Sequence, residues 1–309
     1  MYPRKASDQI VRRLVVGSVL TATALLTSWG AESRPSLLLQ PLPPLQPFLA
    51  EARARLVSDQ LLQVHYTFEE RHTHYDHDAA GNATQTFEQL IEAYPALEED
   101  LDYRRVVSVN GKSVPARDLE KRDREHAKRV QDWEARIRRD GSNPADRLRQ
   151  REEIAHAKER ALIDELILLY DIRMLDREVI GGRPAIAFSL APRPGYAPKH
   201  PDVRLARHFG GRAWLDEAEH QLLRLEMEAL EDVSLAAGFV AKLSKGSRMV
   251  MERRRFEDGT WLPVRTHYAA SARVLLVKRI ELDQVSECRN YKPQPIDRIP
   301  VVGGVPTIR

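Results

Sequence analysis

The chain has 309 residues, of which 42% are hydrophobic and 30% are charged, which is enough for one large domain or two small ones with a real core. Aromatic residues make up only 6%, so a nucleic-acid stacking surface is not expected. The formal net charge is +3, but residues 1–30 carry this excess and the remainder of the chain is neutral. The charge therefore gives no argument for a nucleic-acid partner.

Residues 1–30 have the order of an export signal. A basic segment is followed by an apolar run over residues 14–26 and then by small residues. The run is short for a bilayer span of about 20 residues, so the mature protein is predicted to begin at Ala31 or Glu32 and to reside in the periplasm. The alternative is an inner-membrane anchor formed by uncleaved residues 14–29.

A proline-rich leader is expected over residues 31–47, since residues 32–47 contain five prolines and proline cannot donate a hydrogen bond in a helix interior. A helix is expected to follow at about residues 48–62. The apolar residues on about one face of this helix are Leu49, Ala52, Leu56 and Leu61.

The hydrophobic period then changes to two, which is typical of half-buried strands. Leu62, Val64, Tyr66 and Phe68 alternate with polar residues. A second strand is predicted around residues 84–94, and a third ends at the turn signal Asn110-Gly111.

Residues 115–169 are predicted to interrupt the strands with two helices. Residues 115–160 contain 14 Lys/Arg and 11 Asp/Glu, so this segment is expected to be a solvated, charged helical hairpin whose thin apolar stripes bury little. Asp140-Gly141 is predicted to end the first helix. Asn143 is expected to cap the second, with Pro144 at its first position.

Strands resume after Tyr170 and give about ten antiparallel strands in total, before an irregular tail at residues 293–309. The fold class is therefore mainly β (α+β), a single domain over residues 48–292 with the helical insertion at 115–169. Most strands alternate, so one face of the sheet is expected to be core and the other wet. A long antiparallel sheet tends to curl, and helices over its open side would bury the apolar face.

The stretch RHTHYDHD is the one candidate for metal chemistry. On a strand His72, His74 and Asp76 share a face and could approach one ion. The stretch abuts a turn, however, so weak, adventitious metal binding or a plain solvated hairpin tip is favoured over a functional site. The sequence shows no catalytic signature, and neither an enzyme nor a cofactor is predicted. Cys288 is the only cysteine, so no internal disulfide can form.

Apolar and aromatic residues at strand spacing are predicted to line a cavity wall. Tyr170, Ile172 and Met174 are expected on one strand face and Leu223, Leu225 and Met227 on another. Core burial and cavity lining are compatible for the two strand tryptophans, because a cavity wall is also a core face. The whole predicted wall is Tyr66, Phe68, Tyr170, Ile172, Met174, Trp214, Leu223, Leu225, Met227 and Trp261.

The order of these segments carries a family resemblance over residues 48–292. Its most specific pieces are Asn110-Gly111-Lys112, Gly182-Arg183-Pro184, and Gly211, Trp214, Asp216, Arg224 and Glu226. This arrangement resembles the periplasmic proteins grouped with the outer-membrane lipoprotein-sorting proteins (LolA/LolB-like). The resemblance implies a half-open, curved antiparallel β-barrel covered by helices, whose hydrophobic cavity takes lipid acyl chains or other apolar ligands. The chain departs from that pattern in its large charged insertion at 115–160.

Three functions are consistent with these observations. The first is an exported, non-enzymatic carrier that holds a lipid or lipoprotein acyl chain and contacts the membrane only transiently, for example in lipoprotein sorting. The second is an envelope sensor or assembly adaptor that uses the helical hairpin to bind a protein partner. The third is a metal-dependent enzyme built around His72, His74 and Asp76.

Overall fold

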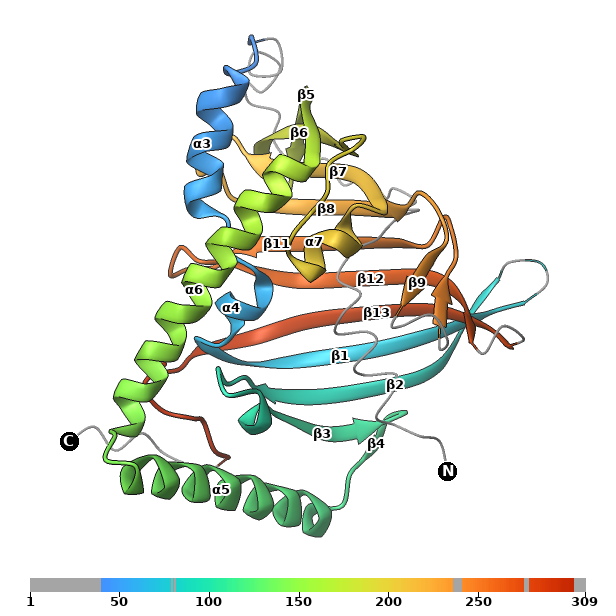
Figure 1. Cartoon of the computed structure of the whole chain (residues 1–309). Coiled ribbons are helices and arrows are strands. Elements are labelled where there is room, and N and C mark those ends of the chain that lie inside the picture. Colours follow the sequence, from blue (N-terminus) through green and yellow to red (C-terminus); the bar gives the residue numbers. More distant parts are fainter. Residues whose placement is uncertain (1–39, 79, 81, 236–240, 275–277, 303–309) are drawn as a thin grey trace. The chain divides into compact units, whose positions relative to one another are not determined.

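The computed structural model describes residues 40–78, 80, 82–235, 241–274 and 278–302 (Figure 1). The chain divides into two compact units. Unit 1 comprises Met1–Leu56 and Leu162–Gln284, and unit 2 comprises Val57–Ala161 and Val285–Arg309. The predicted export signal and most of the leader lie outside the described residues, as does the end of the tail. No helix within the described ranges is long and apolar enough to cross a bilayer.

The described elements are strands joined by short turns and a few helices. The helices are α3 (Leu45–Arg55), α4 (Asp59–Gln63), the short 3-10 helix η1 (Glu99–Leu101), α5 (Ala116–Arg139), α6 (Pro144–Leu169) and α7 (Pro201–Ala206). The strands are β1 (Tyr66–His77), β2 (Ala83–Tyr94), β3 (Tyr103–Val109), β4 (Lys112–Ser113), β5 (Tyr170–Ile180), β6 (Arg183–Pro192), β7 (Phe209–Asp216), β8 (Leu222–Ala229), β9 (Val233–Leu235), β10 (Ala241–Leu243), β11 (Arg248–Arg255), β12 (Trp261–Val274) and β13 (Lys278–Pro293).

Unit 1 is built on a four-stranded antiparallel sheet in the order β5-β6-β7-β8. Strands β10 and β11 each pair with β12, and β9 pairs with β10. The hairpin between β5 and β6 turns at Gly181 and Gly182, which both have positive φ, a conformation that glycine adopts without steric cost. The sheet is antiparallel and does not close on itself.

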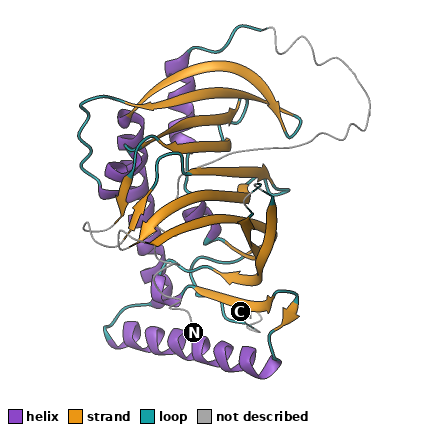
Figure 2. Ribbon diagram, turned by 90° about the vertical axis from the view of Figure 1, so that its right-hand side faces the viewer, coloured by secondary structure: helices purple, strands orange, loops and turns teal. Residues whose placement is uncertain are grey.

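Unit 2 contains the strand order β4-β3-β2-β1, and every pair is antiparallel. The two-residue turn between β3 and β4 is Asn110-Gly111, with φ of 48° and 71°, as its sequence predicted. Strands β1 and β2 are long and curve along their length (Figure 1). Figure 2, in which strands are orange, shows α5 running beside the β3 end of this unit.

The helix expected at residues 48–62 is two helices, because α3 ends at Arg55 and α4 begins at Asp59. Ser58 between them has extended backbone, and its hydroxyl accepts a hydrogen bond from the Leu61 amide at 3.3 Å. Such an N-cap satisfies an orphan amide of a new helix. The chain therefore changes unit between these helices, since α3 belongs to unit 1 and α4 to unit 2.

Helix α5 packs within unit 2 through three buried side chains, and the rest of its 24 residues are not buried, in line with the thin apolar stripe that was predicted. Its Val130 and Trp133 are 6% exposed and form a core cluster with Leu101 and Leu148. Its His126 is fully buried and stacks on a strand tyrosine. Few apolar side chains suffice here because large aromatic residues bury much area each.

The predicted fold class is confirmed as mainly antiparallel β structure with helices and an open sheet. The expectation of one wet face fails at the centre of unit 1. Residues Ala185, Ile186, Ala187 and Phe188 of β6 are consecutive and at most 1% exposed. Because neighbouring strand residues point to opposite faces, both faces of the sheet are covered there.

Candidate functional site

One face of the four-stranded sheet in unit 1 is apolar. One core cluster lies beneath α3 and contains Phe48, Ala52, Ile186, Phe188, Ala213 and Leu215. Another cluster lies beside the end of α6 and contains Leu169, Tyr170, Val203, Ala206, Phe209, Met227, Ala229, Val233 and Leu243. Ile172, Leu190 and Leu225 pack against both clusters, so the two form a continuous surface, here called the apolar layer.

The sequence of each strand explains why the layer forms. Ile186, Phe188 and Leu190 alternate along β6, so they share a face. The register places Ala213 opposite both Phe188 and Leu225, which extends the apolar row across three strands. Burial raises the pKa of Tyr170 in this layer, and its hydroxyl donates to the Ala206 carbonyl at 2.9 Å.

Helix α3 covers its part of the layer with two buried and two half-buried apolar side chains, the latter being Leu45 and Leu49. Only Phe48 and Ala52 of the helix are buried, and the Phe48 ring lies 5.6 Å from the Phe188 ring. The helix starts after Pro44 without a side-chain cap. Its remaining polar contacts, such as the 2.5 Å pair between Arg53 and Asp164, are exposed and contribute little to stability.

The opposite face of the same sheet carries a second cluster, made of Ala185, Ala187, Trp214, Leu223 and Trp261. Arginines lie over its indole rings: the Arg183 guanidinium carbon is 5.2 Å from the Trp261 ring centroid, and that of Arg224 is 5.7 Å from the Trp214 ring centroid. Such cation–π contacts are worth about 0.5–2 kcal/mol. The second face is therefore closed by charged side chains.

Asp216 organises the charges on this second face. Its carboxylate is 1% exposed, accepts a 2.5 Å hydrogen bond from Arg183, and accepts the Ala218 and Glu219 amides at 3.0 and 2.7 Å. Burial by itself opposes ionisation, but the Arg183 and amide hydrogen bonds outweigh it and hold the pKa of Asp216 below its ordinary value. The charge is thus paired and hydrogen-bonded, as a buried carboxylate requires.

Gly211 has a steric role in the same sheet. A Cβ at this position would lie 1.9 Å from the Glu226 carbonyl oxygen, so β7 and β8 can approach only if no side chain is present. Gly211, Trp214, Asp216 and Arg224 all belong to the motif that carries the family resemblance. In this structure they hold the sheet and its turn together.

The predicted cavity wall separates into three places. Tyr170, Ile172, Met174, Leu225 and Met227 belong to or pack against the apolar layer. Trp214, Leu223 and Trp261 form part of the second face, while Tyr66 and Phe68 pack around Tyr291 in unit 2.

A β-bulge explains why Leu223 is separated from Leu225. The register of β7 and β8 shifts between Trp214 and Leu215, where Leu215 pairs with Leu222 and Trp214 with Arg224. Leu223 is the extra residue, and such an insertion reverses the alternation beyond it. A strict period of two therefore assigned Leu223 to the wrong side of the sheet.

The stretch RHTHYDHD ends β1, and its last residues are exposed. A bulge between His74 and Tyr75 interrupts its register. His72 pairs with Glu70 at 2.5 Å, and the ring of His74 meets that of Phe87 edge-on. Within the described residues, His72, His74 and Asp76 do not bring three ligand atoms together, and weak metal binding by this stretch stays a prediction. The group that the sequence did not single out is His65, Glu152 and His156.

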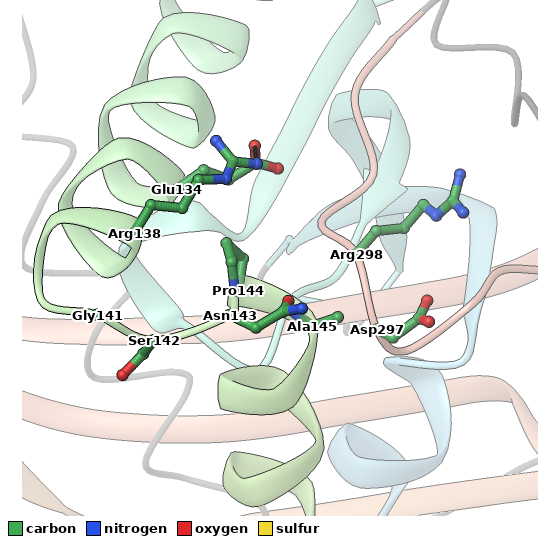
Figure 3. A pocket seen from close by; sticks show the side chains of 9 residues that line it. All are labelled: Glu134, Arg138, Gly141, Ser142, Asn143, Pro144, Ala145, Asp297 and Arg298. Carbon is green, nitrogen blue, oxygen red and sulfur yellow. Dashed lines mark hydrogen bonds and ion pairs between the residues drawn. The ribbon is translucent and has the colours of Figure 1, made fainter.

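A polar pocket of about 720 Å³ lies at the turn between α5 and α6 (Figure 3). Its lining residues are Glu134, Arg138, Gly141, Ser142, Asn143, Pro144, Ala145, Asp297 and Arg298. Asn143 accepts the Ala145 amide at 2.9 Å, and α6 begins at Pro144, as predicted for this helix start. The lining is charged, unlike that of the expected apolar cavity.

The single thiol, Cys288, is half-buried. Burial raises the pKa of Cys288 to about 11, so little thiolate exists at neutral pH. The absence of enzymatic activity stays a prediction.

No family model matches the sequence, and no curated protein does. Solved structures do match. A putative outer membrane lipoprotein-sorting protein domain from Vibrio parahaemolyticus is 7% identical, with coverage of 80% of this chain and 91% of its own and a TM-score of 0.29. A DUF1329 family protein from Desulfovibrio piger is 12% identical, covering 84% and 95%, with a TM-score of 0.28. A LolA superfamily protein from Nitrosomonas europaea is 9% identical, covering 81% and 93%, with a TM-score of 0.27.

The Vibrio and Nitrosomonas proteins carry the names of the group that the sequence resembles, and each of the three matches extends over most of this chain. Superpositions with TM-scores below 0.3 carry no argument about ligand or function. The fold therefore rests on the strand pairing described above, and the candidate site rests on the apolar layer.

Proposed function

We propose that this protein is an exported, non-enzymatic carrier that binds a lipid acyl chain, or an apolar ligand of similar shape, on the apolar layer of unit 1. This proposal rests on the way in which helix α3 covers the layer. A broad apolar face is sheltered by one helix, α3, which packs on it through Phe48, Ala52 and the half-buried Leu45 and Leu49. Lipoprotein sorting in the periplasm is the specific role that the proposal favours.

In the proposed mechanism, the ligand replaces helix α3 on the apolar layer. Helix α3 moves off the sheet, and an acyl chain takes the place of Phe48 over Ile186, Phe188 and Leu215. Exposing the Phe48 side chain costs about 1.5–3 kcal/mol, and exposing the half-buried Leu45 and Leu49 adds to that cost. Burying about ten methylenes contributes roughly 8 kcal/mol before the costs of association. The exchange therefore favours a ligand longer than the side chain that it replaces.

Native mass spectrometry of the protein from an envelope extract tests whether an apolar molecule co-purifies with it. Binding of a fluorescent fatty acid then tests the place. Leu225→Gln puts an amide into the layer, and we expect it to weaken binding about tenfold or more. Leu175→Gln is the matched control on β5, since Leu175 is 40% exposed and lies outside both clusters.

Equal binding by the two leucine variants would contradict a site on the apolar layer. The adaptor function predicts a different result, in which no lipid co-purifies and an envelope protein is captured through residues 115–160. Capture by the full chain and by a variant with altered charges on α5 distinguishes these outcomes.

A further inference from the structure

Three metal-ligating side chains of unit 2 converge at the start of β1. The His65 Nε2 atom lies 3.1 Å from Glu152 Oε1, and the His156 Nε2 atom lies 3.9 Å from the same oxygen. All three ligand atoms are within 4.8 Å of one another. Glu152 and His156 are one helical turn apart on α6, so they share a face of the helix, whereas His65 comes from a distant part of the sequence.

The spacing fits one small cation. Zinc bound at about 2.0–2.2 Å by imidazole nitrogen and carboxylate oxygen places its ligand atoms roughly 3.3–3.5 Å apart. The observed separations lie on both sides of that value, so small rotations of half-exposed side chains would close the group. Two histidines and one glutamate are also a ligand set that zinc takes in proteins, with a further position left for water.

Both sides of this group are held by the fold of unit 2. The backbone of His65 lies between buried Val64 and Tyr66, and its carbonyl accepts the Gln294 amide at 2.8 Å. On α6, Leu148 is buried in a core cluster, and Glu159 accepts the Ser58 hydroxyl at 2.6 Å. The residues next to these ligands are buried or hydrogen-bonded, unlike those at the exposed end of β1. This matters because a metal site needs ligands that are held in fixed positions.

The charge of the group also favours a cation. Within the described ranges, the Glu152 carboxylate contacts the imidazoles of His65 and His156, and no lysine or arginine forms an ion pair with it. The Glu152 side chain is only 20% exposed, and both imidazoles lie beside it. A bound divalent ion would neutralise it and make a ligand of each imidazole.

We propose that His65, Glu152 and His156 form a binding site for one zinc ion, or for another divalent transition metal that prefers imidazole. The ion joins α6 to the first residue before β1, two segments that are far apart in the sequence. Since the ligands are not assembled in the unfolded chain, binding stabilises the folded state in proportion to metal concentration.

The test uses the full chain without a histidine tag, freed of metal with a chelator and titrated with Zn²⁺ by calorimetry and thermal unfolding. We expect one ion per chain at the tight site. At a free concentration of about 100 times Kd, the midpoint of unfolding should rise by roughly 5 °C or more. Co²⁺ absorption supplies an independent readout, since its visible spectrum reports the coordination geometry.

His65→Gln and His156→Gln are each expected to weaken zinc binding at least tenfold and to abolish the thermal shift. His156 is 40% exposed on a helix, so the metal-free His156→Gln variant should unfold within about 1 °C of the wild type. The matched control is the triple variant His72→Gln, His74→Gln and His77→Gln, which should keep the tight ion.

The proposal is overturned if the wild type binds no zinc in the calorimeter. Retention of the tight ion by both His65→Gln and His156→Gln would overturn it too. Loss of the ion in the triple variant would instead place the metal at the end of β1.

Discussion

Asp216 in unit 1 and Asp78 in unit 2 close hairpin turns in the same local way. One carboxylate oxygen of Asp216 accepts the amides two and three residues ahead, at 3.0 and 2.7 Å. One oxygen of Asp78 accepts the amides two and four residues ahead, at 2.9 and 2.8 Å. Both turns use the preference of aspartate for capping its own backbone.

The surroundings of the two aspartates differ completely. Asp216 is 1% exposed, and its partner Arg183 lies over the Trp261 ring. Asp78 is exposed, and its other oxygen accepts the Asn82 side-chain amide. The same hydrogen-bond pattern therefore carries different energetic weight, because a buried charge that loses its partner cannot be compensated by water.

The largest effect is expected in β7, the strand that ends at Asp216. Gly211→Ala would place its Cβ 1.9 Å from the Glu226 carbonyl oxygen, and backbone must move to relieve that contact. We expect a loss of about 4 kcal/mol or failure to fold. Gly210→Ala is the neighbouring control, where the nearest backbone atom is 3.1 Å away, and it should lose less. Denaturant unfolding measures both, and equal losses would contradict the steric role of Gly211.

The next effect tests the two turns directly. Asp216→Asn keeps an acceptor for the turn amides but removes the buried charge that pairs with Arg183, which keeps Glu219 at 2.7 Å as a carboxylate partner, so we expect a loss of about 1.5–3 kcal/mol. Asp78→Asn keeps the same capping pattern in water and should lose less than about 1 kcal/mol. The free energy of unfolding of each variant, compared with that of the wild type, measures the two losses. Similar losses at the two sites would mean that capping, rather than burial, sets the contribution of Asp216.

Turns of this kind are the part of the fold that the sequence predicts best. Asn110-Gly111 and Gly181-Gly182 are local signals, and the structure gives each of these residues a positive φ. The antiparallel direction of the strands then follows from alternation between turns, although about ten strands were predicted and thirteen are described. The burial of Asp216 cannot be predicted from local signals, because the residues around it come from β6, the β7–β8 turn and β12.

The sequence predicted only those parts of the candidate site that depend on local alternation. Alternation placed Tyr170, Ile172 and Met174 correctly on one side of β5. It failed at Leu223, since no local signal marked the bulge. The convergence of His65 with His156 also leaves no pattern in the sequence, because it depends on how α6 passes the start of β1 within unit 2.

Acid should reduce the difference between wild type and Asp216→Asn. The folded pKa of Asp216 is lowered by Arg183 and the turn amides, despite opposing burial, and lies below the unfolded value of about 3.9. The unfolded state therefore binds the proton first. The stabilisation is complete above about pH 5 and is lost as pH falls through the folded pKa, at no more than about 1.4 kcal/mol per pH unit.

Free energies of unfolding between pH 6 and pH 2.5 measure this difference. Other carboxylates titrate in both proteins and cancel in the comparison. A constant difference between wild type and Asp216→Asn across that range would show that the charge of Asp216 does not stabilise the fold.

The smallest effect is expected at the far end of β1, near Asp78. Replacing His72, His74 and His77 together by glutamine should cost less than about 1 kcal/mol. His77 is exposed, and glutamine at position 72 can still donate to Glu70.

His126→Gln in the same unit is the buried counterpart, since His126 is 0% exposed and its ring stacks 4.4 Å from that of Tyr103. That single change should cost more than the triple one, by about 1–2 kcal/mol, because it removes stacking and leaves space in a packed contact. Denaturant midpoints of the two variants, taken in the presence of a chelator, separate packing from metal binding. If the triple variant proves the less stable, the end of this hairpin carries structure that its exposure does not reveal.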